Sequence, residues 1–276
     1  SLIAALAAAP ALAQDSENAD EVFPTSEALE DEGADVHTVI VSSGNTPEAR
    51  GEQLIDQIEQ ILAETGAEKV NLIGHSHGSP TSRYAAAVIP DKVASVTGIA
   101  GVNNGVEFAD EISAGNQDLM ESLVPLIAGL VTFISGNENP NDVAAALASM
   151  DTEGMNAFNA AYPAGSISPN SCGEGDYTVN GINYYSWSGR SDQLAHQTDL
   201  IDPSDLIMAY TGSVYDRPND GLVATCSSHL GKVIRDDYFL NHLDSVNQVL
   251  GLTNSLTTNP VSIFVNHANR LKKANL

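Results

Sequence analysis

Residues 70–80, VNLIGHSHGSP, place a serine between two glycines at the end of a short apolar run. The apolar residues are typical of a buried parallel strand, and the alanine-rich segment from Pro80 is typical of a helix with proline at its first position. Ser76 is therefore predicted to lie on a strand-to-helix corner. Its surroundings match Gly-x-Ser-x-Gly, in which small residues allow a strained turn that exposes the hydroxyl. Because this pattern also occurs in ordinary loops, the flanking strand and helix carry the argument.

Strand-like runs and helical stretches alternate along the chain. The strand-like runs are residues 36–42, 69–74, 93–101 and 221–225. The clearest helix is 47–65, which has Thr46 as its cap, Pro47 at its first position and Gly66 as its stop. Residues 180–181, Asn-Gly, indicate a two-residue hairpin. We expect one α/β domain with a mostly parallel central sheet flanked by helices.

The chain is strongly acidic. It has 36 Asp and Glu against 11 Lys and Arg, which gives a formal charge of −25 over 276 residues. This charge repels nucleic acids and anionic membranes, so we expect no nucleic-acid partner and no stable membrane insertion. The acidity is consistent with life in salty water and equally with an acidic extracellular protein that does not depend on salt.

The first residues, SLIAALAAAPALAQ, have the apolar character of a signal peptide and contain an Ala-x-Ala site before Gln14. We interpret residues 1–13 as a signal-peptide remnant and residues 14–276 as the mature domain of an exported protein. In an exported protein the two cysteines, Cys172 and Cys226, are expected to form a disulfide rather than remain free thiols.

Residues 122–134, SLVPLIAGLVTFI, are apolar almost all round. About 20 such residues are needed to cross a bilayer, so this segment is not predicted to span one. It is either a buried core helix or a mobile hydrophobic cover over a lipid-binding cleft.

A nucleophilic serine needs a histidine to take its proton and a carboxylate to orient that histidine. In one common arrangement these follow the serine in the order acid, then histidine. Candidate histidines are 37, 75, 77, 196, 229, 242 and 267. The first precedes Ser76 and the next two are too close to fold back on it. His242 is the leading candidate, and His229 and His267 remain possible bases. Asp220 is a candidate acid, although an Asp-Gly pair is also an ordinary turn.

Asp244 and Gln248 follow His242 with a spacing of four residues. They would share one helical face or a tight loop, where hard oxygen ligands suit Ca²⁺. The alternative is an amphipathic helix whose Asp and Gln are simply solvated.

Several long motifs, in order from Phe23 to the C-terminus, resemble the secreted true lipases of the Pseudomonas/Burkholderia type. They are VNLIGHSHG, SCGEGDYTVNGINYYSWSG, DPSD, NDGLVATCSSHLGKVIRDDY, NHLDSVNQVLGL and NHANRLKKA. The resemblance implies an α/β-hydrolase fold and a triacylglycerol lipase. It also implies that Ser76 is the nucleophile, Asp220 the acid and His242 the base.

The same resemblance implies a structural Ca²⁺ held by Asp202, Asp244, Gln248 and the carbonyl of Leu252. It implies the disulfide Cys172–Cys226 and a lid near residues 110–136, which favours a cover over a core helix for the apolar segment. Lipases of this type generally need a dedicated foldase chaperone and a secretion machinery, so both are expected partners.

The chain departs from the family near its N-terminus. Members have an apolar strand that ends in a His-Gly loop and supplies an oxyanion donor, but residues 14–35 are acidic and contain no strand-like run. The strands at 36–42 and 69–74 are then expected to pair directly or to leave a gap. Only the backbone N–H of His77 remains identifiable as an oxyanion donor, and loss of one donor costs on the order of 10² to 10³ in rate.

Two smaller departures lie near the nucleophile. Ser79 stands where the family usually has glycine, and residues 101–105, GVNNG, alter the family pattern. We expect little effect from Ser79. The alternatives to an active lipase are a catalytically impaired relative that binds lipid, a gene fragment that does not fold, and a short-chain carboxylesterase with the same triad.

Overall fold

A computed structural model describes residues 2–7, 24–42, 44–117, 121, 142–191, 204–247, 253 and 258–276. These residues form a seven-stranded sheet in the order β2-β1-β3-β4-β6-β5, with β7 also paired to β6. All of its pairings are parallel except β5 with β6. The strands are β1 Leu2–Ala7, β2 Ala34–Val39, β3 Val70–His75, β4 Val93–Ile99, β5 Thr178–Val179, β6 Ile182–Gly189 and β7 Lys232–Tyr238.

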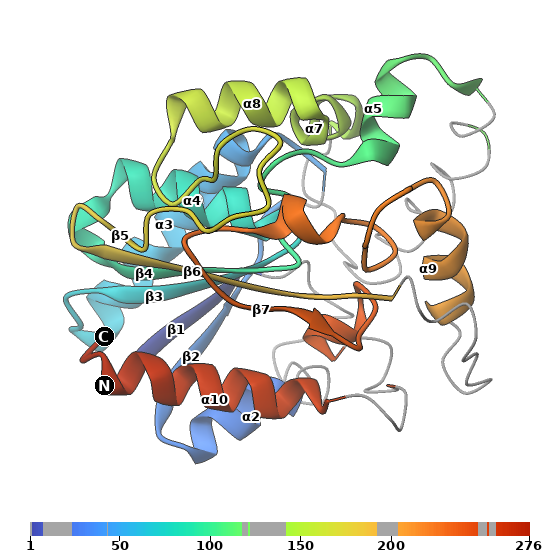
Figure 1. Cartoon of the computed structure of the whole chain (residues 1–276). Helices are drawn as coiled ribbons and strands as arrows, with labels where there is room; N and C mark the ends of the chain where they lie inside the picture. The colour runs from blue at the N-terminus through green and yellow to red at the C-terminus, as the bar shows by residue number, and fades with distance from the viewer. Residues whose placement is uncertain are drawn as a thin grey trace.

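Helices cover both faces of the sheet (Figure 1). Helices α3 (Pro47–Thr65) and α4 (Gly78–Val88) lie on one face, and α2 (Pro24–Asp31) and α10 (Pro260–Lys273) pack together on the other. The remaining helices of the described ranges are α5 Glu107–Ser113, α7 Val143–Met150, α8 Thr152–Ala161 and α9 Ser204–Gly212, with short 3₁₀ turns η1 Pro90–Lys92, η3 Thr225–Ser228 and η4 Asp244–Val246.

The predicted helix 47–65 is confirmed as α3, and its ends have the expected chemistry. The Thr46 side chain accepts a hydrogen bond from the N–H of Ala49 at 3.3 Å, and Gly66 ends the helix with a φ of 70°. Leu54 and Ile58 of its apolar face are buried against the sheet in one hydrophobic cluster. This cluster holds the helical layer that positions the strand before Ser76.

A second hydrophobic cluster fills the opposite face of the sheet. Trp187 of β6 packs edge-on against Phe264 of α10, with ring centroids 5.4 Å apart. Ile73 of β3 and Ile99 of β4 belong to the same cluster. The central strands are therefore buried on both faces, which is why they read as continuous apolar runs.

The N-terminal segment corrects one expectation. Leu2–Ala7, which we interpreted as part of a signal peptide, forms strand β1 and lies between β2 and β3. The expected gap, or direct pairing of β2 with β3, is therefore wrong for this structure. An apolar run of small residues suits a central parallel strand as well as a leader, so composition alone does not distinguish the two roles.

The hairpin at residues 180–181 is confirmed, since Asn180 and Gly181 both have positive φ, 53° and 77°, between β5 and β6. The prediction of a strand at residues 221–225 is wrong. Those residues form a loop that begins in a single bridge between Asn219 and Ala224 and continues into η3. The apolar segment 122–134 and most of the expected lid lie outside the described residues.

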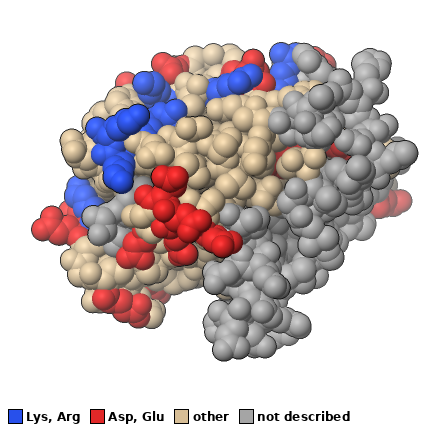
Figure 2. All heavy atoms as spheres, turned by 90° about the horizontal axis from the view of Figure 1, so that it is seen from below, with Lys and Arg blue, Asp and Glu red and all other residues tan. Residues whose placement is uncertain are grey.

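The molecule carries its charges unevenly over the face that holds α2 and α10. Figure 2 shows a large group of acidic side chains in the middle of this face, further acidic groups at its left and lower-left edges, and basic groups along its left and upper margins. The last turn of α10 is basic, with Arg270, Lys272 and Lys273. In the part of the chain that the structure describes, no helix has the length and apolar character needed to cross a bilayer.

Candidate active site

Ser76 lies between the end of β3 and the start of α4, as the sequence predicts. Its φ of 53° is in the left-handed region, which is strained for a residue with a Cβ. Its N–H donates to the carbonyl of Ile99 at 2.9 Å, and its own carbonyl accepts from Val102 at 3.2 Å. The helix begins two residues earlier than expected, so Pro80 is its third residue. Proline's missing N–H costs no intrahelical hydrogen bond there, because the first N–H groups of a helix have no partner inside it.

The glycines on either side of Ser76 permit this turn. A Cβ added to Gly74 would lie 2.2 Å from the carbonyl oxygen of Gly78, because strand and helix backbones come together there. Only glycine at position 74 allows that approach. The Gly-x-Ser-x-Gly pattern is thus explained by a backbone contact as well as by the φ of the serine.

Asp220 and His242 lie in contact although 22 residues separate them. His242 Nδ1 is 2.8 Å from Asp220 Oδ2, and both side chains are buried. The backbone N–H of His242 also donates to the carbonyl of Asp220 at 2.8 Å. A buried carboxylate bonded to Nδ1 holds the imidazole in the tautomer that leaves Nε2 available to accept a proton.

The carboxylate of Asp220 is itself held by its own loop. Its Oδ1 accepts hydrogen bonds from the N–H groups of Leu222 at 3.0 Å and Val223 at 2.8 Å, which leaves Oδ2 directed at His242. Gly221 has a φ of 104°, and a Cβ there would lie 2.6 Å from Cβ of Met208. The Asp-Gly pair is therefore a turn and a carboxylate support at the same time.

His75 connects the serine segment to the base, a contact that sequence reasoning did not predict. Its Nε2 is 2.9 Å from the carbonyl oxygen of His242, and the two ring centroids are 4.5 Å apart. Burial, with the nearby His242 adding to it, lowers the pKa of His75 well below its usual value. A neutral His75 places no positive charge beside the His242 imidazole. Within the described residues no hydrogen bond joins Ser76 Oγ to His242.

The residue after the serine, His77, is buried and caps α4. Its backbone N–H is therefore at a helix start, where amides have no carbonyl one turn back and can bind an anion. Burial, and secondarily the charge of Arg50, lowers the pKa of the His77 imidazole well below its usual value. This side chain is neutral and structural, and only the backbone of His77 suits the oxyanion role.

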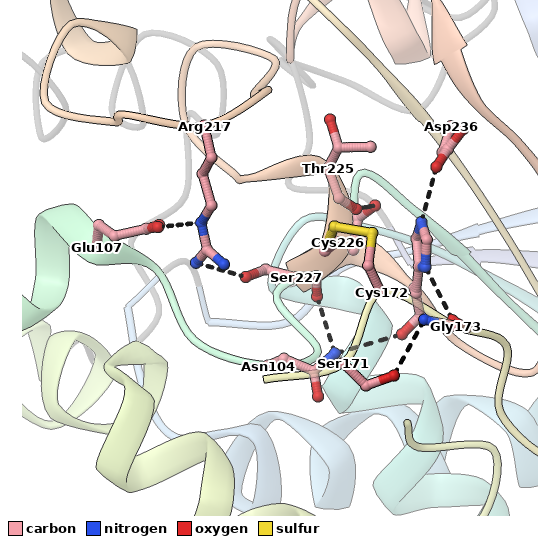
Figure 3. Close-up of a disulfide and its surroundings, with 12 residues drawn as sticks. Asn104, Glu107, Ser171, Cys172, Gly173, Arg217, Thr225, Cys226, Ser227 and Asp236 are labelled. Carbon is pink, nitrogen blue, oxygen red and sulfur yellow. Dashed lines mark hydrogen bonds and ion pairs between the residues drawn. A yellow bond between two sulfur atoms is a disulfide. The ribbon is translucent and has the colours of Figure 1, made fainter. Parts of the chain in front are cut away.

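The other candidate bases lie elsewhere. His229 is bonded through Nε2 to Asp236 at 3.0 Å and through Nδ1 to the carbonyl of Gly173 at 2.9 Å (Figure 3). His267 lies under the sheet on α10, where its Nε2 is 2.8 Å from the Thr97 hydroxyl. Neither shares a hydrogen bond with Ser76 or Asp220, and position 196 lies outside the described residues.

The predicted disulfide is confirmed between Cys172 and Cys226, with Cα atoms 4.8 Å apart. Figure 3 shows it close to Thr225 and Ser227, which belong with Cys226 to the turn η3. Next to the disulfide, Arg217 forms an ion pair with Glu107, and Nη2 of Arg217 lies 3.5 Å from the hydroxyl of Ser227. The bridge encloses a 54-residue separation, and closing such a loop contributes about 4 kcal/mol in the chain-entropy treatment.

Of the expected calcium ligands only Asp244 is among the described residues; Asp202, Gln248 and Leu252 lie outside them. Asp244 is buried, and its Oδ2 accepts from the N–H of Asn241 at 3.0 Å. Asp205 is also buried and accepts from Asn241 Nδ2 at 3.0 Å.

Two buried carboxylates that meet one asparagine beside His242 are the hard oxygen donors that Ca²⁺ prefers. The described part of the chain has no group of three or more His, Cys, Asp or Glu arranged for a metal. The described residues therefore suit a calcium ion but do not complete its ligand set.

Comparisons with known proteins agree with this geometry. The α/β hydrolase fold family matches residues 12–245. A triacylglycerol lipase of Vibrio cholerae is 49% identical over 91% of this chain and 81% of its own length, and one of Pseudomonas fragi is 39% identical over 91% and 89%. The crystal structure of Staphylococcus hyicus lipase has the same fold, with a TM-score of 0.59, 18% identity, and coverage of 99% and 96%. The chain belongs to the bacterial triacylglycerol lipases of the α/β-hydrolase fold.

Proposed function

We propose that this chain hydrolyses the ester bonds of triacylglycerols through an acyl-enzyme on Ser76. The observation that carries the proposal is the buried 2.8 Å bond between His242 Nδ1 and Asp220 Oδ2, beside the strained serine turn. A local Gly-x-Ser-x-Gly turn occurs in many loops, but a buried acid–histidine pair next to one is the constellation of nucleophilic ester hydrolysis.

Each residue has one role in this reaction. Ser76 Oγ attacks the ester carbonyl while His242 Nε2 takes its proton, and His242 then gives that proton to the leaving alcohol. Asp220 keeps the imidazole in the required tautomer and stabilises its charged form. Water releases the fatty acid by the same steps in reverse order. The Ser76–His242 hydrogen bond forms in the substrate complex, since such bonds are often long in free enzymes.

The N–H of His77 supplies one donor to the oxyanion, and a second is needed from another segment. Strand β1 ends at Ala7, whose register partner is Gly74, two residues before the nucleophile. The chain therefore leaves β1 at the edge of the sheet where that donor is required. The argument for an impaired enzyme depended on the absence of this strand, and with β1 in place we favour the active lipase.

The test is hydrolysis of emulsified triolein by the purified protein and by Ser76→Ala. We expect release of oleate that the substitution lowers by at least about 10³-fold. Tributyrin emulsion and soluble 4-nitrophenyl butyrate are measured in parallel. Hydrolysis of the soluble butyrate alone would identify a short-chain carboxylesterase, and equal rates for wild type and Ser76→Ala on every substrate would refute the enzyme.

We also infer a structural Ca²⁺ held by Asp202, Asp244, Gln248 and the carbonyl of Leu252. An ion there would neutralise buried carboxylate charge and stiffen the loop after His242. Removal of calcium with EGTA should lower the melting temperature, and added Ca²⁺ but not Mg²⁺ should restore it. Asp244→Asn should abolish this response, whereas an unchanged melting curve with EGTA would reject the site.

We propose that the enzyme is secreted and acts on acylglycerols at a lipid–water interface. The disulfide supports an oxidising compartment. A foldase chaperone and a secretion machinery are proposed as partners from the family resemblance. Cleavage before Gln14 would remove β1, so we expect Leu2–Ala7 to remain in the mature protein; intact-mass measurement of the protein from culture medium checks this.

A further inference from the structure

Two buried residues near the nucleophile, Ser79 and Asn103 of the segment 101–105, touch each other. Ser79 Oγ donates to Asn103 Oδ1 at 2.9 Å, and both residues have a relative exposure of 0%. Ser79 is on α4, three residues after Ser76, and Asn103 is in the loop after β4. Neither side chain can reach substrate, so any influence on the reaction must act through position.

The pair has space because two neighbouring positions are glycine. A Cβ on Gly98 would lie 2.5 Å from Ser79 Oγ, and one on Gly101 would lie 2.6 Å from Ser79 Cβ. Both distances are far inside van der Waals contact, so a larger residue at either position would displace the serine. The hydroxyl at position 79 is therefore part of a fitted contact.

Ser79 is hydrogen-bonded directly to the backbone of the nucleophile, and Asn103 is linked to it through its neighbour Val102. The carbonyl of Ser76 accepts from the N–H of Ser79 at 3.1 Å and from the N–H of Val102, next to Asn103, at 3.2 Å. The Ser79–Asn103 bond thus closes a small ring of hydrogen bonds around the backbone of the nucleophile. Sequence alone suggested little effect from Ser79, and this contact shows the reason to revise that expectation.

Asn103 then reaches the segment that follows the catalytic acid. Its backbone N–H donates to the carbonyl of Ser227 at 3.1 Å, and its Nδ2 donates to the carbonyl of Ser228 at 3.0 Å. These carbonyls belong to η3, which directly follows the Asp220 turn. A hydrogen bond closes the Asp220 turn, because the N–H of Thr225, the first residue of η3, donates to the carbonyl of Pro218 at 2.8 Å.

We propose that Ser79 and Asn103 are positioning residues that hold the nucleophile turn and the Asp220 loop in register for ester hydrolysis. This inference rests on the proposed function. Asn103 uses both ends of its side chain, since its Oδ1 accepts a hydrogen bond from the Ser79 hydroxyl and its Nδ2 donates to the carbonyl of Ser228 in η3. A displacement of reacting groups by about 1 Å can lower the rate about 10²-fold. Loss of the Ser79–Asn103 bond should displace the serine turn by less, so we expect a smaller decrease in rate.

Strands β3 and β4 lead into the segments that carry Ser76 and Asn103, and a matched control lies at the opposite end of these two strands. Ser95 Oγ donates to Asn71 Oδ1 at 2.6 Å, both side chains are buried, and the two residues are register partners on β3 and β4. The chemistry of this bond is the same, but it lies at the amino ends of the strands, away from Ser76. Ser95→Ala therefore measures the structural cost of losing a buried serine–asparagine bond.

The experiment compares Ser79→Ala, Asn103→Ala, the double variant and Ser95→Ala on tributyrin, at a temperature below all melting transitions. Ser79→Ala should lower kcat about tenfold with KM unchanged. Ser95→Ala should lower the melting temperature by about as much as Ser79→Ala does, but it should leave kcat within about twofold of wild type. The double variant should lose less than the product of the two single losses, because both remove the same bond.

Equal kcat for Ser79→Ala and Ser95→Ala would overturn the inference, as would fully multiplicative losses in the double variant. If Ser79→Ala does not fold, Ser79→Cys is measured in its place, since a thiol still fills the site but is a weak donor. Wild type and Ser76→Ala are included in every series. Absence of Ser76-dependent activity in wild type would refute the proposed function itself, and a Ser76-dependent rate that Ser79 does not affect would refute only the positioning role.

Discussion

The proposed nucleophile and the proposed acid–base pair are held by supports of different kinds. Ser76 lies between a buried strand and a helix, and its turn is set by backbone contacts such as that between Gly74 and Gly78. Asp220 and His242 lie on loops on either side of β7, and hydrogen bonds to their polar groups hold them. Steric changes should therefore damage the first support, and changes in charge or hydrogen bonding the second.

The largest expected effect is on the acid–base pair. Asp220→Asn should lower kcat by about 10⁴-fold, because an amide does not hold His242 in the required tautomer. The chain offers a second buried histidine with a carboxylate partner, His229 with Asp236 at 3.0 Å, as a control. Asp236→Asn should leave kcat within about twofold. Similar losses in both variants, measured on tributyrin, would mean that Asp220 contributes only to folding.

The next effect tests the steric support. Gly74→Ala should lower kcat by about 10²-fold, since its Cβ would displace the Gly78 carbonyl and with it the serine turn. Gly66→Ala is the control, because a Cβ there meets no atom within 4 Å and costs only about 1 kcal/mol at a helix end. Retention of full activity by Gly74→Ala would show that the turn adapts, and the contrast between the two supports would disappear.

The smallest expected effect on the site concerns α10, which packs under the sheet that carries both supports. It is an effect on the pH dependence of stability. Burial, with the charge of Arg270 adding to it, lowers the pKa of His267 to about 3. The unfolded chain takes up a proton near pH 6.5 and the folded chain does not, so stability falls as the pH drops from about 6.5 toward 3. His267→Gln should remove up to about 1.4 kcal/mol of this decline per pH unit in urea unfolding. An unchanged pH slope would place the imidazole in water.

Local sequence was sufficient wherever the deciding contacts are local. Helix α3 begins and ends at the predicted residues because Thr46, Pro47 and Gly66 act within one turn. The hairpin at Asn180 follows for the same reason, since the turn needs two residues of positive φ. The serine turn likewise depends on two glycines within two residues of Ser76.

Local sequence failed where strand and loop are decided by neighbours. Residues 221–225 have strand-forming composition, but Asp220 accepts the N–H groups of Leu222 and Val223, and those bonds make a turn instead. The gap expected between β2 and β3 was wrong because the apolar run Leu2–Ala7 carries no sign of its strand partners. The first error arises because a side chain two to three residues away bonds the backbone in place of a strand partner. The second arises because the strand partners of Leu2–Ala7 are distant in sequence and leave no local periodicity.

The sequence by itself determined the nucleophile turn, the α/β alternation and the pairing of the only two cysteines, since each depends on residue type over short stretches or on a count. Tertiary structure decided that Asp220 rather than another carboxylate meets His242, that β1 separates β2 from β3, and that Ser79 meets Asn103. These contacts join residues between 22 and about 70 positions apart, and their geometry exists only after the sheet has brought the loops to one edge.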